Sequence, residues 1–311
     1  MQGARKFLSR RKMLFVLFAM FIIMSAASPF FLRRANLTAV FAQIAIYGVA
    51  SVGMAFAIIC GELDLSIGPV MALSGIILVQ TEARAGFGPA LIAALAVCAC
   101  IGLLNGWLVT GVRISSFVTT LATMLAISGV ALLVQPAPTP IRIDAFLEFG
   151  SGRIGVFPYI FIVFIGFIIL AQIVLCRTRY GRNIYAAGGS AEAAAKAGIP
   201  VKRYKRSVFL ITSLSAAVAG IMLVGRLGSS SAIYASNAAL SSISNLVIGG
   251  ISLSGGRGDA IDALVGIFIM GIVTNALSIF GVSAFNRLWI EGVILIIVVS
   301  IDAVMRNRRK I

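Results

Sequence analysis

Long apolar stretches constrain the fold of this chain more than any other feature of its sequence. Ten of them follow one another along the 311 residues, at about 13–32, 37–60, 66–82, 89–110, 114–135, 158–176, 207–227, 240–255, 260–281 and 288–305. Most approach the roughly 20 residues that a helix needs to cross the hydrocarbon core of a bilayer. Because backbone amides cannot stay unpaired in lipid, each stretch is predicted to be helical. We therefore expect an all-α, polytopic membrane protein with about ten transmembrane helices, forming a single transmembrane domain over residues 1–311.

The composition supports lipid as the solvent for most of the chain. Hydrophobic residues make up 60% of it and charged residues 12%, about half the usual share of a soluble protein. The net charge of +16 would suggest nucleic acid as a partner of a soluble protein. Here the basic residues lie at the chain ends and between apolar stretches, where orientation signals lie. Nucleic-acid binding is therefore not expected.

The distribution of Lys and Arg predicts the orientation of the chain. With ten crossings and a cytoplasmic N-terminus, 19 basic residues fall on the inner side and 7 on the outer side. This is the asymmetry that the positive-inside rule requires. An even number of crossings also places the C-terminus in the cytoplasm. The first stretch is long for a signal peptide and more stretches follow, so we interpret it as an uncleaved helix.

Residues that could carry out catalysis or bind a metal are scarce. The chain has no His, and its four cysteines form no CxxC pair: Cys60, Cys98, Cys100 and Cys176. A GxxxxGK[ST] phosphate-binding loop is also absent. We therefore expect a protein that is not an enzyme, holds no metal and binds no cofactor itself. Any ATP must be bound by a partner.

One long basic segment, 177–206, contains a short run of strong helix formers. Residues 191–197 read Ala-Glu-Ala-Ala-Ala-Lys-Ala, and Gly198 and Pro200 follow. This pattern predicts a short helix that ends at the glycine. On the inner side of the membrane, such a helix could be an ordinary surface element or a docking element for another subunit.

A second segment, 61–68, places two carboxylates between apolar stretches in a chain with only ten acids. It reads Gly-Glu-Leu-Asp-Leu-Ser-Ile-Gly, and Pro69 follows. Ser66 can cap the next helix, where Pro69 is tolerated in the first turn. Two interpretations remain open. The segment is either a capped turn at the membrane edge or part of a translocation path.

These segments resemble one known family. Residues 61–68 are similar to the GGIDLSVG signature of the ribose/galactose/xylose-type sugar permeases of ATP-binding-cassette importers, and Glu192 to Gly198 fits the EAAxxxG pattern of importer permeases. Other stretches resemble the same family in order along the chain: Asn-Gly-Trp-Leu-Val at 105–109, residues 117–124, 181–190, 247–258 and 275–283. The resemblance covers residues 15–305.

The resemblance implies roles for particular residues. It implies contacts to a partner ATPase by Glu192, Ala193, Ala194 and Gly198. It implies a translocation path or gate that includes Asp64, Ser66, Asn105, Phe117 and Asn275. It also implies three partners: a cytoplasmic ATP-binding-cassette ATPase that holds ATP and Mg, a periplasmic sugar-binding protein, and a second permease copy or close relative. The expected location is the bacterial inner membrane.

The chain also departs from the family pattern. Glu62 stands where the family usually has Gly, which suggests that Glu62 is more dispensable than Asp64, and residues 285–292 are atypical. An alternative function is an ion-coupled secondary transporter that uses Glu62, Asp64 or Glu291 as its titrating group. The identity of the sugar and of the second permease stays open. It also stays open whether 61–65 and 256–259 are cytoplasmic turns or breaks within the membrane.

Overall fold

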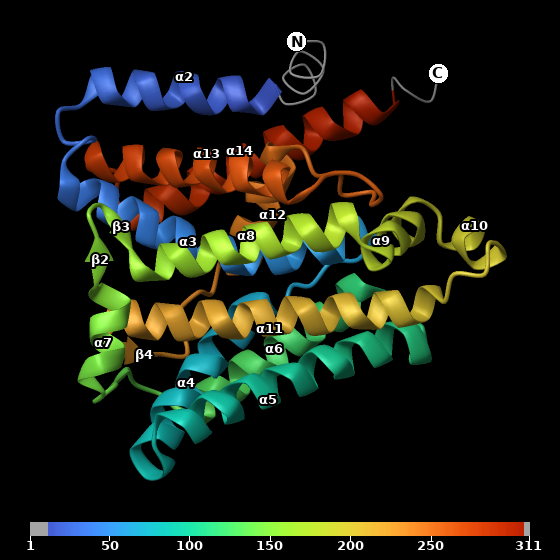
Figure 1. Ribbon diagram of the computed structural model, residues 1–311, viewed down its shortest axis with the longest axis horizontal. Helices are drawn as coiled ribbons and strands as arrows, with labels where there is room; N and C mark the ends of the chain where they lie inside the picture. Colours follow the sequence, from blue (N-terminus) through green and yellow to red (C-terminus); the bar gives the residue numbers. More distant parts are fainter. Residues whose placement is uncertain (1–11, 308–311) are drawn as a thin grey trace.

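The computed structural model describes residues 12–307, which form mainly helices that run side by side along one axis (Figure 1). The helices are α2 (Lys12–Ala27), α3 (Arg34–Ile59), α4 (Ile67–Ala85), α5 (Phe87–Trp107), the π-helix η1 (Leu108–Val112), α6 (Ser116–Val134), α7 (Asp144–Ser151), α8 (Tyr159–Arg177), α9 (Arg179–Gly189), α10 (Ala191–Lys196), α11 (Val201–Leu227), α12 (Ala238–Gly249), α13 (Ala260–Ile279) and α14 (Ala284–Asn307). Four two-residue strands join them: β1 (Thr139–Pro140), β2 (Arg153–Ile154), β3 (Phe157–Pro158) and β4 (Ser229–Ser230).

The helices agree with a polytopic membrane protein. Each of the ten expected stretches overlaps a helix, so the mainly helical architecture is confirmed. Within the described residues, six helices are long and apolar enough to cross a bilayer: α3, α5 with η1, α6, α8, α11 and α13. Ten crossings therefore remain a prediction. The cytoplasmic termini also remain one, because residues 1–11 and 308–311 lie outside the described part.

Several helix ends differ from the expected ranges. The sequence gives a physical reason for three of these differences. The helix expected over 13–32 ends at Ala27, just before Pro29, because the residue preceding a proline is disfavoured in a helix. The helix expected over 240–255 ends at Gly249. The next residue, Gly250, has a φ of 107°, a left-handed conformation that favours glycine and ends the helix. The helix expected over 207–227 begins at Val201, because its basic first turns continue the helix beyond the apolar run.

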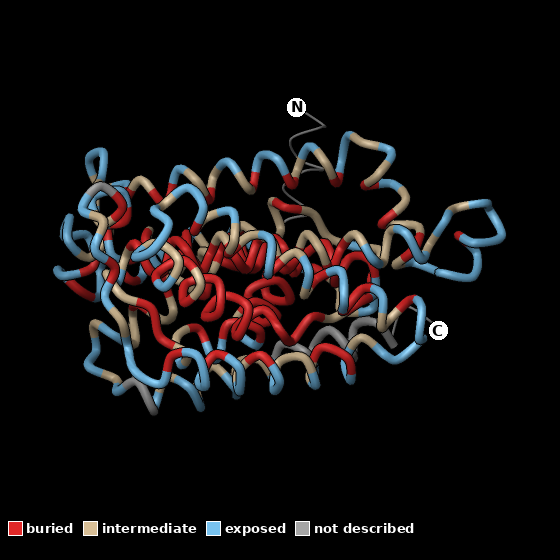
Figure 2. Tube along the Cα trace, turned by 90° about the horizontal axis from the view of Figure 1, so that it is seen from below, coloured by how far each residue is buried: buried red, intermediate tan, exposed pale blue. Residues whose placement is uncertain are grey.

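The core lies around α3 and α11, which are buried along most of their length (Figure 2). Helix α11 packs against α3, α4 and α5. Glycines permit close contact on α3, where Gly48 lies against the Phe164 ring and Gly53 against Ser215. Helices α5, α6 and α8 instead expose rows of large apolar side chains, including Leu104, Leu125 and Leu170. Such outward faces are suited to lipid.

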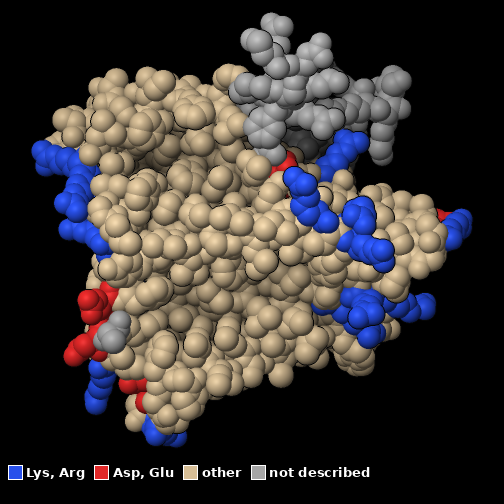
Figure 3. Space-filling view, viewed as in Figure 1, with Lys and Arg blue, Asp and Glu red and all other residues tan. Residues whose placement is uncertain are grey.

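Charged side chains gather toward the two ends of the molecule. Lys and Arg lie toward the ends of the long axis, and a broad central belt on the face shown has no charge (Figure 3). Helices α9 and α10 lie at one end, and α7 with the β2–β3 hairpin lies at the other (Figure 1). Strand β1 pairs with β4 and so joins two connections that are distant in the sequence. These short strands are absent from the all-α expectation.

Candidate functional site

The segment between α3 and α4 turns into the protein interior. Gly61 has a φ of +81°, a left-handed conformation that favours glycine and redirects the chain after α3. Leu63 is then held from α6. Its N–H donates to the Ser116 hydroxyl, and its carbonyl accepts from the Thr120 hydroxyl. Glu62 and Asp64 are only 6% and 0% exposed. The segment is therefore irregular backbone buried inside the protein.

A chain of hydrogen bonds connects Asp64 to two further helices. The Ser66 hydroxyl and N–H donate to Asp64 Oδ1 at 2.5 and 3.0 Å. Asn105 Nδ2 of α5 donates to the Ser66 hydroxyl at 3.1 Å, and the Thr123 hydroxyl of α6 donates to Asn105 Oδ1 at 2.7 Å. Ser66 does occupy the N-cap position of α4, but its hydroxyl makes no capping hydrogen bond. The structure thus brings Asp64, Ser66 and Asn105 together, and it adds Thr123.

Burial changes the acidity of Asp64. It raises the pKa of this carboxyl to about 6, and the two hydrogen bonds from Ser66 only partly oppose that effect. Oδ2 finds no hydrogen-bond partner among the described residues. Asp64 therefore carries its proton at a higher pH than an ordinary aspartate.

Glu62 forms an ion pair that the sequence did not indicate. Its Oε1 lies 2.5 Å from Nζ of Lys205 in α11, and the Lys205 side chain is 24% exposed. The pair joins the 60–66 segment to the first turns of α11, which form the end of the long basic segment 177–206. Removal of one partner would leave a partly buried charge without its counter-ion. Glu62 is thus expected to matter more than its departure from the family signature suggested.

Two other predicted path residues lie elsewhere. Phe117 is 53% exposed on α6, outside the Asp64 hydrogen-bond chain. Asn275 of α13 exchanges hydrogen bonds with Asn36 of α3 at 2.7 and 3.1 Å. The described structure therefore does not bring Phe117 or Asn275 to Asp64, and a role for either in the path stays a prediction.

Helix α10 projects from one end of the molecule (Figure 1). The Ser190 hydroxyl accepts from the N–H of Ala193 and caps the helix, and Gly198 ends it with a φ of +81°. Ala194 faces inward and is buried, whereas Ala193 and Glu192 are exposed. The exposed side of α10 therefore combines the small side chains of Ala191, Ala193 and Ala195 with an ion pair between Glu192 and Lys196. Its contact with an ATPase stays a prediction.

Helix α9 connects α10 to the buried segments. A Cβ at Gly188 would overlap the carbonyl oxygen of Ile59, so α9 lies directly on the end of α3. Gly256 donates its N–H to the same carbonyl at 2.8 Å. The Tyr185 hydroxyl donates to the carbonyl of Gly258 at 2.6 Å. We call Ile59, Gly188 and Gly256 the glycine junction. It joins α9 to the connections that precede α4 and α13.

The three acids of the secondary-transporter alternative do not gather at one site. Glu62 pairs with Lys205 and Asp64 accepts from Ser66. The Thr274 hydroxyl lies 3.4 Å from Glu291 Oε1. In the part of the chain that the structure describes, no three His, Cys, Asp or Glu side chains are grouped to hold a metal ion.

Several membrane-length helices, a buried polar chain and a projecting short helix are together typical of a polytopic membrane protein. Residues 36–299 match the family described as the permease component of the branched-chain amino acid transport system. The chain belongs to this permease family, as the sequence motifs predicted.

Known relatives resemble the chain over most of their length. It is 35% identical to the ribose import permease protein RbsC of Bacillus subtilis, over 92% of this chain and 90% of the relative. It is 33% identical to the L-arabinose ABC transporter permease protein AraH of Azospirillum brasilense, over 99% and 91%. It is 35% identical to the fructose import permease protein FrcC of Rhizobium meliloti, over 89% and 80%. No solved structure matches the chain.

Proposed function

We propose that this chain is the permease subunit of an ATP-binding-cassette importer that moves a monosaccharide across the bacterial inner membrane. The observation that carries the proposal is the near full-length similarity to ribose, arabinose and fructose permeases. Relatives of this kind are transport subunits and not enzymes. The permease family also favours this function over an ion-coupled secondary transporter.

Sugar is favoured over a branched-chain amino acid as the substrate. The family description names branched-chain amino acid transport, but the relatives that align with 89–99% of this chain carry the names of sugars. Their near-complete alignment includes the segments around Asp64 and α10. The family description is broad, so the individual relatives are the better guide to substrate class.

Three partners complete the proposed importer. A cytoplasmic ATPase holds ATP and Mg and docks on α10 at Glu192, Ala193, Ala194 and Gly198, of which Ala194 is buried in the unbound chain. A periplasmic sugar-binding protein delivers its load to the opposite end, near α7 and the β2–β3 hairpin. A second permease copy or close relative covers the remaining face. The contacts between α9, α3 and the 250–259 connection support a mechanical link from α10 to the interior.

Uptake in proteoliposomes tests the function. The chain is reconstituted with its ATPase and binding protein, and labelled D-ribose, L-arabinose, D-fructose and D-allose are offered with ATP on the ATPase side. At least one sugar should accumulate only when ATP is present, and an ionophore should have no effect. Accumulation that the ionophore abolishes and that ATP does not change would instead identify a secondary transporter.

A further inference from the structure

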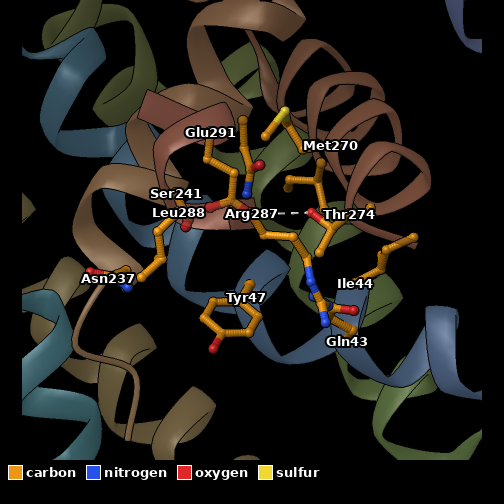
Figure 4. A pocket seen from close by; sticks show the side chains of 13 residues that line it. Gln43, Ile44, Tyr47, Asn237, Ser241, Met270, Thr274, Arg287, Leu288 and Glu291 are labelled. Carbon is orange, nitrogen blue, oxygen red and sulfur yellow. Dashed lines mark hydrogen bonds between the residues drawn. The ribbon is translucent and has the colours of Figure 1, made fainter. Parts of the chain in front are cut away.

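A cavity of about 210 Å³ lies between α3, α12, α13 and α14, away from the Asp64 hydrogen-bond chain. One water needs roughly 10–15 Å³ of such space, so the cavity can hold a small solute. Its polar lining comes from Gln43, Tyr47, Asn237, Ser241, Asn245, Thr274, Arg287 and Glu291. Figure 4 shows that the labelled side chains come from α3, α13, α14 and the beginning of α12.

The residues that line the cavity are spaced four positions apart on all four elements. Gln43 and Tyr47 lie four residues apart on α3, Arg287 and Glu291 on α14, and Met270 and Thr274 on α13. At α12 the positions are Asn237, which is the N-cap residue, Ser241 and Asn245. Residues four apart share one helix face. Each helix therefore turns a continuous face toward the cavity.

Some of these polar groups already form hydrogen bonds within the protein, and others form none to the described residues. Asn245 Nδ2 donates to Ser51, and Arg287 donates to the carbonyl of Val282 and the hydroxyl of Ser278. By contrast, the side chains of Gln43, Tyr47 and Asn237 make no hydrogen bond to another described residue. An amide and a phenol can each donate and accept. The free groups therefore suit hydroxyls, which do the same.

The polar lining of the cavity favours water or protein over lipid as its neighbour. Gln43 and Asn237 are exposed, and Arg287 and Glu291 are partly exposed, on helices whose other residues are mainly apolar. Ionisable and amide side chains in spanning helices face a water-filled cavity or protein. We therefore expect the cavity to open either on a water-filled translocation path or on an interface with another protein subunit.

We propose that this cavity is a monosaccharide subsite within each permease copy, where Gln43, Tyr47 and Asn237 bind sugar hydroxyls during passage. Ile44, Met270 and Leu288 supply an apolar wall for the C–H face of the ring. The proposal rests on the proposed function and adds a position for the substrate. A free amino acid fits less well, because two guanidinium nitrogens of Arg287 already donate to Val282 and Ser278 and the carboxylate of Glu291 also lines the cavity.

The test compares two cavity variants with a matched control in the complete importer. Gln43→Leu and Tyr47→Phe each remove hydrogen-bonding atoms from the cavity. Gln172→Leu makes the same change on α8, outside the cavity lining. Membrane insertion and assembly with the ATPase serve as folding controls. Maximal ATP-driven uptake is measured for D-ribose, L-arabinose, D-fructose and D-allose at saturating binding protein.

Each cavity variant should slow uptake about 2- to 10-fold for some sugars and less for others, since one neutral hydrogen bond is lost to one particular hydroxyl. Gln172→Leu should match the wild type. An equal loss for every sugar would indicate a merely structural role and overturn the subsite.

Thiol labelling gives an independent readout. Ser241→Cys is introduced into a chain whose four native cysteines are replaced, and the transported sugar should slow its labelling. Protection by L-leucine and not by any of the four sugars would overturn the sugar assignment. Suppose that the wild type moves sugar with ATP, but no sugar slows the labelling and the cavity variants behave like the control. The subsite would then be wrong, and the proposed function would stand. If the wild type moves none of these sugars with ATP, the proposed function fails first.

Discussion

Asp64 ionises inside the protein, where Ser66 supplies two donors to Oδ1 and Oδ2 has no described partner. Asp64→Ala should remove the acceptor and leave the Ser66 N–H and hydroxyl unsatisfied, at a cost of about 1–3 kcal/mol. Asp64→Asn keeps an acceptor oxygen and should retain assembly and transport. Thermal unfolding in detergent and ATP-driven uptake measure the two effects. Loss of assembly and transport with Asn, together with full function with Ala, would contradict this role.

The raised pKa of Asp64 also fixes the sign of a pH dependence. The folded chain holds the proton up to about pH 6, whereas an unfolded aspartate loses it near 3.9. Between these values the folded state binds more protons, so the free energy of unfolding falls as pH rises. Above about pH 6 this contribution is constant. Asp64→Asn should remove the decline, which pH-resolved thermal unfolding can detect.

At the level of single residues, the sequence predicted part of the candidate site. Asp64, Ser66 and Asn105 were predicted together because their motifs resemble one family, and hydrogen bonds do join them. Lys205 could not be singled out, because it is one of eight basic residues within 177–206. Nothing in the sequence pairs it with Glu62 across 143 positions. That contact depends on how α11 packs.

Among the helices, α9 and α10 offer a sharp test of coupling to the ATPase. Ala193→Trp places bulk on the exposed face of α10 and should prevent the ATPase from copurifying with the permease. Gly188→Ala leaves that face intact but forces α9 away from Ile59. It should therefore keep the ATPase bound while sugar-stimulated ATP hydrolysis falls.

The chain provides its own control for the glycine junction. A Cβ at the neighbouring Gly189 would meet nothing within 4 Å. Gly189→Ala should thus leave hydrolysis and uptake unchanged. Ala137→Trp controls for bulk on an exposed alanine in the connection between α6 and β1. Equal behaviour of Gly188→Ala and Gly189→Ala would refute transmission through the junction.

Helix positions were more predictable than the way the helices meet. Apolar runs located the helices because lipid requires backbone pairing within each segment. The cavity between α3, α12, α13 and α14 was not predicted, although Glu291 had been noted. Its signal is a set of residue pairs four positions apart, polar on α3, α12 and α14 and joined by Thr274 on α13. Such pairs are common, and only packing shows that they share one cavity.

At the scale of the whole molecule, the charge-free belt on the face shown in Figure 3 leads us to predict that the two ends lie on opposite sides of a membrane. Glu148 on α7 and Ala195 on α10 are exposed at these ends. In a chain without the native cysteines, Glu148→Cys should react with an impermeant thiol reagent from outside. Ala195→Cys should react only after the cells are permeabilised.

An internal comparison strengthens that labelling experiment. Lys202→Cys, exposed at the start of α11, should behave like Ala195→Cys because both belong to the segment predicted to be cytoplasmic. Reaction of Glu148→Cys and Ala195→Cys from the same side would exclude the orientation that the 19-to-7 distribution of basic residues predicts.

The contact between Gln135 and Ser230 has a consequence for biosynthesis. Gln135 is buried, its amide donates to the Ser230 carbonyl at 2.7 Å, and its carbonyl accepts from the Ser230 hydroxyl at 3.0 Å. A ribosome adds about 5–20 residues per second, so Gln135 waits roughly 5 to 20 seconds for a partner 95 positions later. During that interval α6 is already made, while the β1–β4 pairing cannot yet exist. This end of the protein is therefore completed only after α11 has been synthesised.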